Sequence, residues 1–126
     1  MEHIKLEKIT KIYRSEGLEV TALSDFSVSI EEGEMIAVVG ASGSGKTTLL
    51  NIIGLLDNFE EGKYYFKGKD ISACKDREQS EIRNRDIGFV FQDYSVLPNE
   101  TALFNVMLPL FFSKDKIKTM KAKALK

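Results

Sequence analysis

The glycine-rich segment at residues 40–47 constrains this chain more than any other feature of its sequence. It reads Gly-Ala-Ser-Gly-Ser-Gly-Lys-Thr and matches the pattern G-x-x-x-x-G-K-S/T, the P-loop. The apolar run Met-Ile-Ala-Val-Val precedes it at residues 35–39, and apolar residues at helical spacing follow from Lys46 onward. Such an unbroken run is typical of a strand covered on both faces. The sequence therefore predicts a buried strand, a tight loop and a helix.

The P-loop residues are suited to binding ATP together with Mg²⁺. A helix N-terminus offers unpaired N–H groups and a partial positive charge, and glycines let the backbone approach phosphate oxygens closely. We expect Lys46 to contact the terminal phosphates and the Thr47 hydroxyl to coordinate Mg²⁺. The ATP-binding residues expected here are Gly40, Ala41, Ser42, Gly43, Ser44, Gly45, Lys46, Thr47 and Thr48. The alternative, an ordinary glycine-rich turn, leaves the flanking strand and helix patterns unexplained.

Alternation of apolar and polar residues predicts an antiparallel start to the chain. Ile4 and Leu6 alternate with charged residues, and the segment at residues 26–30 shows the same period, so both are expected to be strands with one buried face. Residues 14–17 between them are polar and turn-prone. A hairpin-like arrangement of the two strands follows.

The remaining elements are shorter. The sequence predicts strands at residues 64–66 and 89–91, the second of them buried, and a surface helix within residues 75–86. Residues 101–112 are expected to be helical, with Pro109 breaking or kinking the helix. Residues 114–126 carry six lysines and are expected to form an amphipathic helix, whose narrow apolar stripe favours a solvated face over a lipid or nucleic-acid surface.

Charge and composition exclude several classes of protein. Eighteen Lys and Arg residues against 19 Asp and Glu residues leave no global field to attract nucleic acid, so no nucleic-acid partner is expected. The longest apolar stretch, residues 102–112, is shorter than the roughly 20 residues of a bilayer crossing. The single Cys74 and a start without an apolar signal core indicate a cytosolic protein without disulfides.

A block downstream of the P-loop gives the chain a family resemblance. Gly-Phe-Val-Phe-Gln stands at residues 88–92, and Leu97-Pro98 follows. With the P-loop, this block makes the chain resemble an ABC transporter ATPase, over about residues 4–109. Leu-Asn-Ile-Ile-Gly at residues 50–54 and Phe-Gln-Asp-Tyr at residues 91–94 most resemble the branch that powers macrolide export and lipoprotein release.

The resemblance implies an α/β fold of the P-loop NTPase class. The implied architecture is an ABC-type ATPase core with an N-terminal antiparallel β subdomain, incomplete at the C-terminus. Residues 1–126 would then be a single, truncated nucleotide-binding domain that ends at the start of the helical subdomain. In the family, the strands that border residues 35–39 come from the later half of the domain, so we expect bare strand edges here.

The resemblance also assigns roles to single residues. Tyr13 would stack on the adenine ring, and Gln92 would contact Mg²⁺ and the attacking water, acting with Lys46 in catalysis. The alternatives without a functional role are a partly buried aromatic side chain for Tyr13 and a surface amide at a strand end for Gln92. The loop from Gln92 to Pro98 would contact the membrane subunit of a transporter. A second ATPase subunit would complete a head-to-tail dimer in the cytoplasm, at the inner face of the membrane.

Several elements that complete catalysis in the family are absent from the 126 residues. The sequence contains no Leu-Ser-Gly-Gly-Gln string, no apolar run ending in Asp-Glu, and no histidine after Gln92. Hydrolysis needs a positioned water and charge stabilisation that Lys46 and Thr47 supply only in part. The resemblance implies the ATP-binding half of a subunit that couples MgATP binding and hydrolysis to export or lipoprotein release through membrane partners, and we expect this chain alone to be inactive. The alternative is a nucleotide-binding fragment or split-protein module without turnover of its own. A P-loop kinase or DNA-repair ATPase would leave residues 92–106 unexplained.

Overall fold

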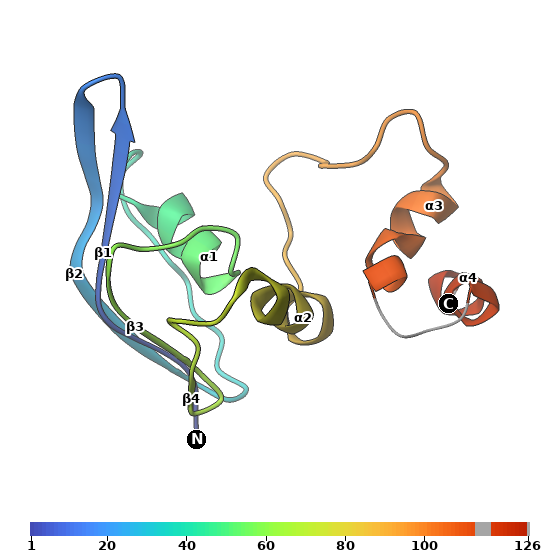
Figure 1. Cartoon of the computed structure of the whole chain (residues 1–126), viewed down its shortest axis with the longest axis horizontal. Helices are drawn as coiled ribbons and strands as arrows, with labels where there is room; N and C mark the ends of the chain where they lie inside the picture. Colours follow the sequence, from blue (N-terminus) through green and yellow to red (C-terminus); the bar gives the residue numbers. More distant parts are fainter. Residues whose placement is uncertain (113–116, 126) are drawn as a thin grey trace. The chain divides into compact units, whose positions relative to one another are not determined.

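The computed structural model of the chain describes residues 1–112 and 117–125 (Figure 1). These residues divide into two compact units, Met1–Gln79 and Ser80–Lys126. The first unit contains the sheet, the P-loop and the helix that follows the P-loop. The second unit contains the helices of the C-terminal part.

An antiparallel sheet of four strands forms the framework of the first unit. Its strands lie in the order β2-β1-β3-β4, so β1 is hydrogen-bonded on both sides. The bounds are Glu2–Ser15 for β1, Leu18–Glu31 for β2, Glu61–Phe66 for β3 and Lys69–Asp70 for β4. A two-residue turn with positive φ at Glu16 and Gly17 joins β1 to β2, which confirms the predicted hairpin. The strand predicted at residues 64–66 is confirmed within β3.

A bulge in β1 changes which side chains face the interior. The register shifts between Leu6 and Ile9, and Lys8 within this stretch has a φ of 51°. Both Leu6 and Ile9 are buried, although they are three residues apart. A bulge inserts one residue and reverses the alternation of faces. From Ile9 onward, Lys11 and Tyr13 therefore follow the buried face of the strand.

Helix α1, Lys46–Ile53, packs on the sheet and closes the core. Five side chains are less than 2% exposed: Leu6, Ile9, Ile52, Tyr64 and Ile71. The Tyr64 hydroxyl donates a 2.8 Å hydrogen bond to the Ile53 carbonyl oxygen at the end of α1. Burial raises the pKa of Tyr64 well above its usual range. Apolar burial from strand and helix together holds this unit.

The prediction of a buried strand at residues 35–39 is wrong for this chain. The segment has no regular secondary structure, and the exposed fractions of Met35 and Val39 are 97% and 87%. A strand is stabilised by hydrogen bonds to a neighbouring strand. Among the described residues, none of the four strands of the sheet pairs with this segment. The bare edges expected from the family resemblance account for this outcome.

The second predicted buried strand, at residues 89–91, is also not formed. This segment carries no strand, and Val90 is 96% exposed. The rings of Phe89 and Phe91 instead contact each other, with centroids 4.8 Å apart. As at residues 35–39, an apolar segment forms no strand when no strand among the described residues pairs with it.

The predicted helices are formed. Helix α2, Asp76–Asp86, spans the boundary between the two units, and the second unit continues with α3, Ala102–Met107, a 3-10 helix η1, Leu108–Phe112, and α4, Ile117–Ala124. The Thr101 hydroxyl caps α3 by accepting a 3.1 Å hydrogen bond from the Phe104 amide. The α-helical geometry ends at Met107, two residues before Pro109, as expected. Part of the predicted lysine-rich helix, residues 114–116 and 126, lies outside the described residues.

None of the helices in residues 1–112 and 117–125 combines the length and the apolar character that a bilayer crossing requires.

Candidate phosphate and nucleotide site

The P-loop bends around Gly45, which is the N-cap of α1. Gly45 has a φ of 92°, and a Cβ atom there would lie 2.6 Å from the carbonyl oxygen of Ala22 in β2. Only glycine satisfies both conditions. The Leu49 amide donates the first helical hydrogen bond to the Gly45 carbonyl oxygen, at 2.9 Å. The P-loop therefore contacts the hairpin at Gly45, where no side chain would fit.

The N-terminus of α1 has the features of an anion site. No side chain caps it, and no acidic residue lies in its first turn. The amides of the first turn therefore remain donors, and the helix dipole adds a partial positive charge. An anion such as phosphate satisfies both features.

The ammonium group of Lys46 lies inside the P-loop. It donates hydrogen bonds of 2.6 Å to the Gly40 carbonyl oxygen and 2.7 Å to the Ala41 carbonyl oxygen, and it lies 3.3 Å from the Ser44 hydroxyl. These acceptors are uncharged, whereas hydrogen bonds from an ammonium to a charged oxygen are stronger. The residues of the loop therefore fit an incoming phosphate, which would replace weaker acceptors of the same ammonium.

The two threonines after Lys46 have different surroundings. Thr47 is exposed in the first turn of α1, and its hydroxyl oxygen is a ligand type that Mg²⁺ accepts. Thr48 is half-buried, and its hydroxyl oxygen lies 3.4 Å from the hydroxyl of Tyr13. The structure thus brings Tyr13, near the end of β1, to the same helix that carries the P-loop lysine.

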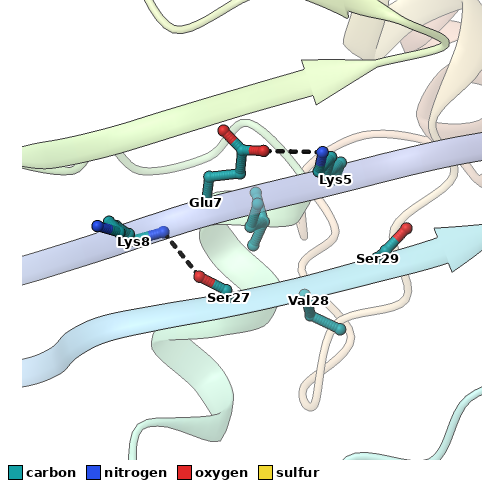
Figure 2. Close-up of a pocket in the computed structure, with 7 residues that line it drawn as sticks. Lys5, Glu7, Lys8, Ser27, Val28 and Ser29 are labelled. Atoms are coloured by element: carbon teal, nitrogen blue, oxygen red, sulfur yellow. Dashed lines mark hydrogen bonds and ion pairs between the residues drawn. The ribbon is translucent and has the colours of Figure 1, made fainter.

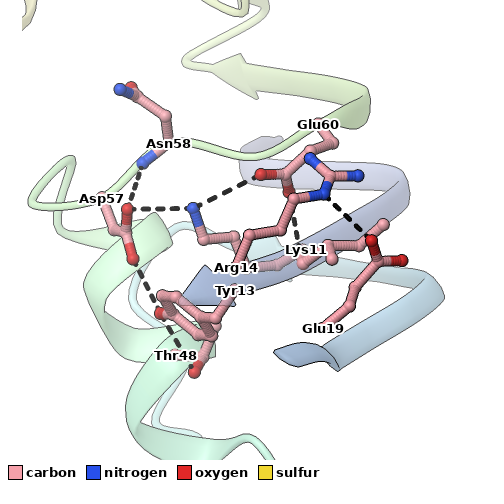
Figure 3. A network of polar contacts seen from close by, with 9 residues as sticks. Lys11, Tyr13, Arg14, Glu19, Thr48, Asp57, Asn58 and Glu60 are labelled. Atoms are coloured by element: carbon pink, nitrogen blue, oxygen red, sulfur yellow. Dashed lines mark hydrogen bonds and ion pairs between the residues drawn. The ribbon is translucent and has the colours of Figure 1, made fainter. Parts of the chain in front are cut away.

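Tyr13 is held by Asp57 and Lys11, to which sequence reasoning gave no role at this site (Figure 3). Its hydroxyl donates a 2.7 Å hydrogen bond to Asp57, and the Lys11 ammonium lies 4.9 Å from its ring centroid. Lys11 also forms ion pairs with Asp57 and Glu60. We call Lys11, Tyr13, Thr48, Asp57 and Glu60 the tyrosine network. One sequence signal was available: Lys11 stands two residues before Tyr13, on the same face of a strand.

Electrostatics keep Asp57 ionised within this network. Burial alone would raise the pKa of the Asp57 carboxyl group, but hydrogen bonds from Tyr13, Lys11 and the Asn58 amide outweigh it, and the pKa is lowered overall. The carboxylate is the form that accepts from both the phenol and the ammonium. The network is therefore intact at neutral pH.

Gln92 lies in the second unit, in an exposed segment without regular secondary structure. A hydrogen bond of 2.8 Å from the Leu97 amide to the Asn105 side chain ties the loop after it to α3. Gln92 and Thr47 belong to different units, so their joint role at Mg²⁺ stays a prediction.

A wide recess of about 600 Å³ lies elsewhere, on β1 and β2 (Figure 2). Two interactions connect its polar groups: the Lys5 ammonium lies 2.8 Å from the Glu7 carboxylate, and the Lys8 amide donates to the Ser27 hydroxyl at 2.9 Å. It is lined by no P-loop residue. The recess therefore has no part in the phosphate site, despite its size.

Comparison with known protein families gives a direct match. The family model described as "ABC transporter" matches residues 23–126. The lipoprotein-releasing system ATP-binding protein LolD of Aquifex aeolicus is 45% identical over 109 residues, which are 86% of this chain and 47% of that protein. The macrolide export ATP-binding/permease protein MacB of Pasteurella multocida is 44% identical over 110 residues, 87% of this chain and 17% of that protein.

A solved structure has the same fold. The dimeric, post-hydrolysis structure of the ATP-binding cassette MJ0796, bound to ADP and Pi, superposes with a TM-score of 0.86 at 40% identity. The match covers 97% of this chain and 54% of that one. The chain therefore spans about half the length of a single cassette.

Proposed function

The chain belongs to the family of ABC transporter ATP-binding proteins, and from that premise we propose that it binds MgATP for a transporter of the export or lipoprotein-release type. It has the ABC ATPase fold with an N-terminal antiparallel β subdomain, over about half of the homologous cassette. The chain is 44% identical to the MacB relative and 45% identical to the LolD relative over the matched residues. The observation that carries the proposal is the Lys46 ammonium enclosed by P-loop oxygens at the uncapped start of α1.

Each end of the nucleotide has candidate partners in the chain. The amides of the P-loop and the Lys46 ammonium would hold the phosphates, and Thr47 and Gln92 would hold Mg²⁺. Bound Mg²⁺ neutralises charge on the phosphate oxygens during phosphoryl transfer. Tyr13 would stack on the adenine ring through the exposed part of its side chain, since 41% of Tyr13 remains accessible.

The proposed partners follow from the family. A membrane subunit would contact the loop from Gln92 to Pro98, where Tyr94 is 94% exposed and Leu97 is 44% exposed. A second ATPase subunit would complete a head-to-tail dimer, and the solved relative MJ0796 is dimeric. The complex would lie in the cytoplasm at the inner face of the membrane. The names of the relatives suggest export of macrolides or release of lipoproteins as the coupled processes.

A second candidate is a nucleotide-binding module without turnover. It is favoured by the coverage of about half a cassette and by the lack of a Leu-Ser-Gly-Gly-Gln string in the 126 residues. Under this proposal residues 1–126 bind MgATP with the same P-loop but do not hydrolyse it alone. A phosphate-release assay separates the two candidates, because turnover above the background of Lys46→Ala would exclude the binding-only module.

The central test is calorimetric titration of the chain with MgATP, before and after Lys46→Ala. We expect the substitution to abolish measurable binding, because the multiply charged phosphate loses its compensating cation. Lys63→Ala is the matched control, since Lys63 is an exposed lysine 3.9 Å from Asp70 on β3 and β4. Its affinity should match that of the unmodified chain. Unchanged affinity in Lys46→Ala would contradict the proposal.

A further inference from the structure

Lys11 is buried, with an exposed fraction of 7%, and is the sole charged residue in the buried class among the residues that the structure describes. Its ammonium lies 3.2 Å from one Asp57 carboxylate oxygen and 3.7 Å from a Glu60 carboxylate oxygen (Figure 3). Desolvating a lysine is costly, and a pair of this kind is weak evidence for a stabilising role. Its position beneath an aromatic ring suggests a different use.

Asp57 links the ammonium to the ring by using both of its carboxylate oxygens. One oxygen faces Lys11 and accepts a 2.8 Å hydrogen bond from the Asn58 amide, while the other accepts the 2.7 Å hydrogen bond from the Tyr13 hydroxyl. The carboxylate is therefore anchored to the backbone just beyond the end of α1. It fixes the phenol end of Tyr13.

The Tyr13 ring is restrained at its edge and on one face. The hydroxyl is held at Asp57 and lies 3.4 Å from the Thr48 hydroxyl oxygen, and the Lys11 ammonium lies over the ring at 4.9 Å from its centroid. Nevertheless 41% of Tyr13 stays exposed. A tyrosine that serves only the core would have its ring covered, whereas this ring is ordered and accessible.

We propose that Lys11 and Asp57 are positioning residues that hold the Tyr13 ring as a preformed stacking surface for the base of the bound nucleotide. The inference rests on the proposed function and extends it to residues that do not touch the nucleotide. Restraining an aromatic side chain beforehand removes part of the entropy cost of binding. Thr48 lies two residues beyond Lys46 on α1, so the stacking surface is connected to the phosphate site through one helix.

The bulge at Lys8 makes this arrangement possible. Because the bulge reverses the alternation of β1, Lys11 and Tyr13 point to the face that meets α1 and the segment after it. Without the inserted residue, both side chains would face the opposite side of the sheet. The bulge at Lys8 therefore determines that Lys11 and Tyr13 lie on the face that meets α1.

The test compares two ligands, MgATP and magnesium tripolyphosphate, because only the first carries a base. Base stacking of about 1–3 kcal/mol corresponds to a preference of roughly 5- to 150-fold for MgATP in the unmodified chain. Asp57→Asn, Lys11→Met and Tyr13→Phe should each reduce that preference about 2- to 10-fold, as loss of one ordering contact predicts. The dissociation constant for tripolyphosphate should change little after Tyr13→Phe, which alters no charge.

Taking the ratio of the two affinities reduces long-range charge effects, which act on both polyanions, and Tyr13→Phe avoids these effects because it changes no charge. Glu19→Gln is the matched control, because Glu19 pairs with Arg14 at 3.0 Å beside the network and is exposed. It should leave the ratio unchanged. Circular dichroism and thermal unfolding establish that each variant is folded, and Tyr13→Phe preserves the ring if Asp57→Asn or Lys11→Met does not fold.

A double-variant cycle sharpens the assignment. Tyr13→Phe removes the donor of one hydrogen bond and Asp57→Asn removes the charge of its acceptor, so the combined variant should lose little more preference than either single variant. Additive losses would contradict a shared role. Equal weakening of both ligands by folded Tyr13→Phe, or an unchanged ratio in all three variants, would overturn the inference.

The outcomes also separate this inference from the proposed function. If the unmodified chain binds tripolyphosphate as tightly as MgATP, the stacking surface is refuted while the phosphate site stands. If neither ligand binds, the proposed function fails and the inference fails with it.

Discussion

Strand β1 and the segment at residues 35–39 differ in outcome although the sequence predicts a strand at both places. β1 is paired with β2 on one side and β3 on the other, and Ile9 at its centre is 0% exposed. Residues 35–39 have no strand partner among the described residues, and Met35 and Val39 are almost fully exposed. Apolar side chains favour a strand, but hydrogen bonds to the backbone of a neighbouring strand are needed to form it.

The comparison also explains how the P-loop is supported. The segment before the P-loop forms no strand. Nevertheless α1, which follows the P-loop, packs against the antiparallel sheet through its buried residues Leu49 and Ile52. Gly45 lies against Ala22 of β2, and Tyr13 reaches Thr48 from β1. The hairpin, rather than the preceding segment, therefore positions the candidate site in this structure.

The largest expected difference between the two regions is in amide hydrogen exchange. The amides of Lys5 and Leu6, which pair with both β2 and β3, should open with a free energy that approaches global unfolding, while amides at residues 35–39 should open at almost no cost. Exchange read by mass spectrometry or NMR would check this. Strong protection at residues 35–39 would mean that the segment has found a strand partner.

Truncation of side chains should give the next largest contrast. Ile9→Ala removes a fully buried side chain and should cost about 2–5 kcal/mol of unfolding free energy. Val39→Ala, the control at a position 87% exposed, should change it by less than about 0.5 kcal/mol. Urea denaturation followed by circular dichroism measures both. Similar losses in the two variants would show that residue 39 is buried in solution.

Two glycines test the contact between the P-loop and the hairpin. Gly17 and Gly45 both have positive φ, but a Cβ at Gly17 meets nothing within 4 Å, whereas one at Gly45 meets the Ala22 carbonyl oxygen. Gly17→Ala should cost roughly 1–2 kcal/mol from backbone strain alone. Gly45→Ala should cost more and also weaken MgATP binding, as denaturation and titration would show. Equal stability losses would argue against the close contact.

The smallest effect is expected at Tyr64, where the sheet is linked to the end of α1. Tyr64→Phe removes the hydrogen bond to the Ile53 carbonyl oxygen and should cost about 1 kcal/mol at neutral pH. Because burial raises the pKa of Tyr64, its contribution is complete below the unfolded value of about 10 and declines as the pH rises above it.

The pH dependence supplies the measurement for this prediction. As the pH rises above about 10, the free energy of unfolding of the unmodified chain should fall more than that of Tyr64→Phe. Denaturation series at stepped pH values measure this difference. Tyr94→Phe is the control, since Tyr94 is 94% exposed. An identical alkaline decline in Tyr64→Phe and the unmodified chain would contradict the burial of this phenol.

Local sequence signals predicted the elements whose partners are close in the chain. The hairpin of β1 and β2 followed from period-two alternation and a turn, and α1 followed from apolar spacing after the P-loop. Thr101 before α3 behaves as an N-cap, and Pro109 falls where α-helical geometry has already ended. Such signals suffice because the interactions that satisfy them are formed by nearby residues.

The sequence by itself determined the P-loop pattern and the helix that begins at Lys46, because glycines, a lysine and a threonine at this spacing favour a tight loop before a helix. Tertiary structure alone decided that residues 35–39 stay outside the sheet, since pairing depends on a neighbour that side-chain pattern does not reveal. It alone also brought Lys11 and Asp57 to Tyr13. That arrangement needs a bulge in β1 and the packing of α1, which join residues more than 40 positions apart in the chain.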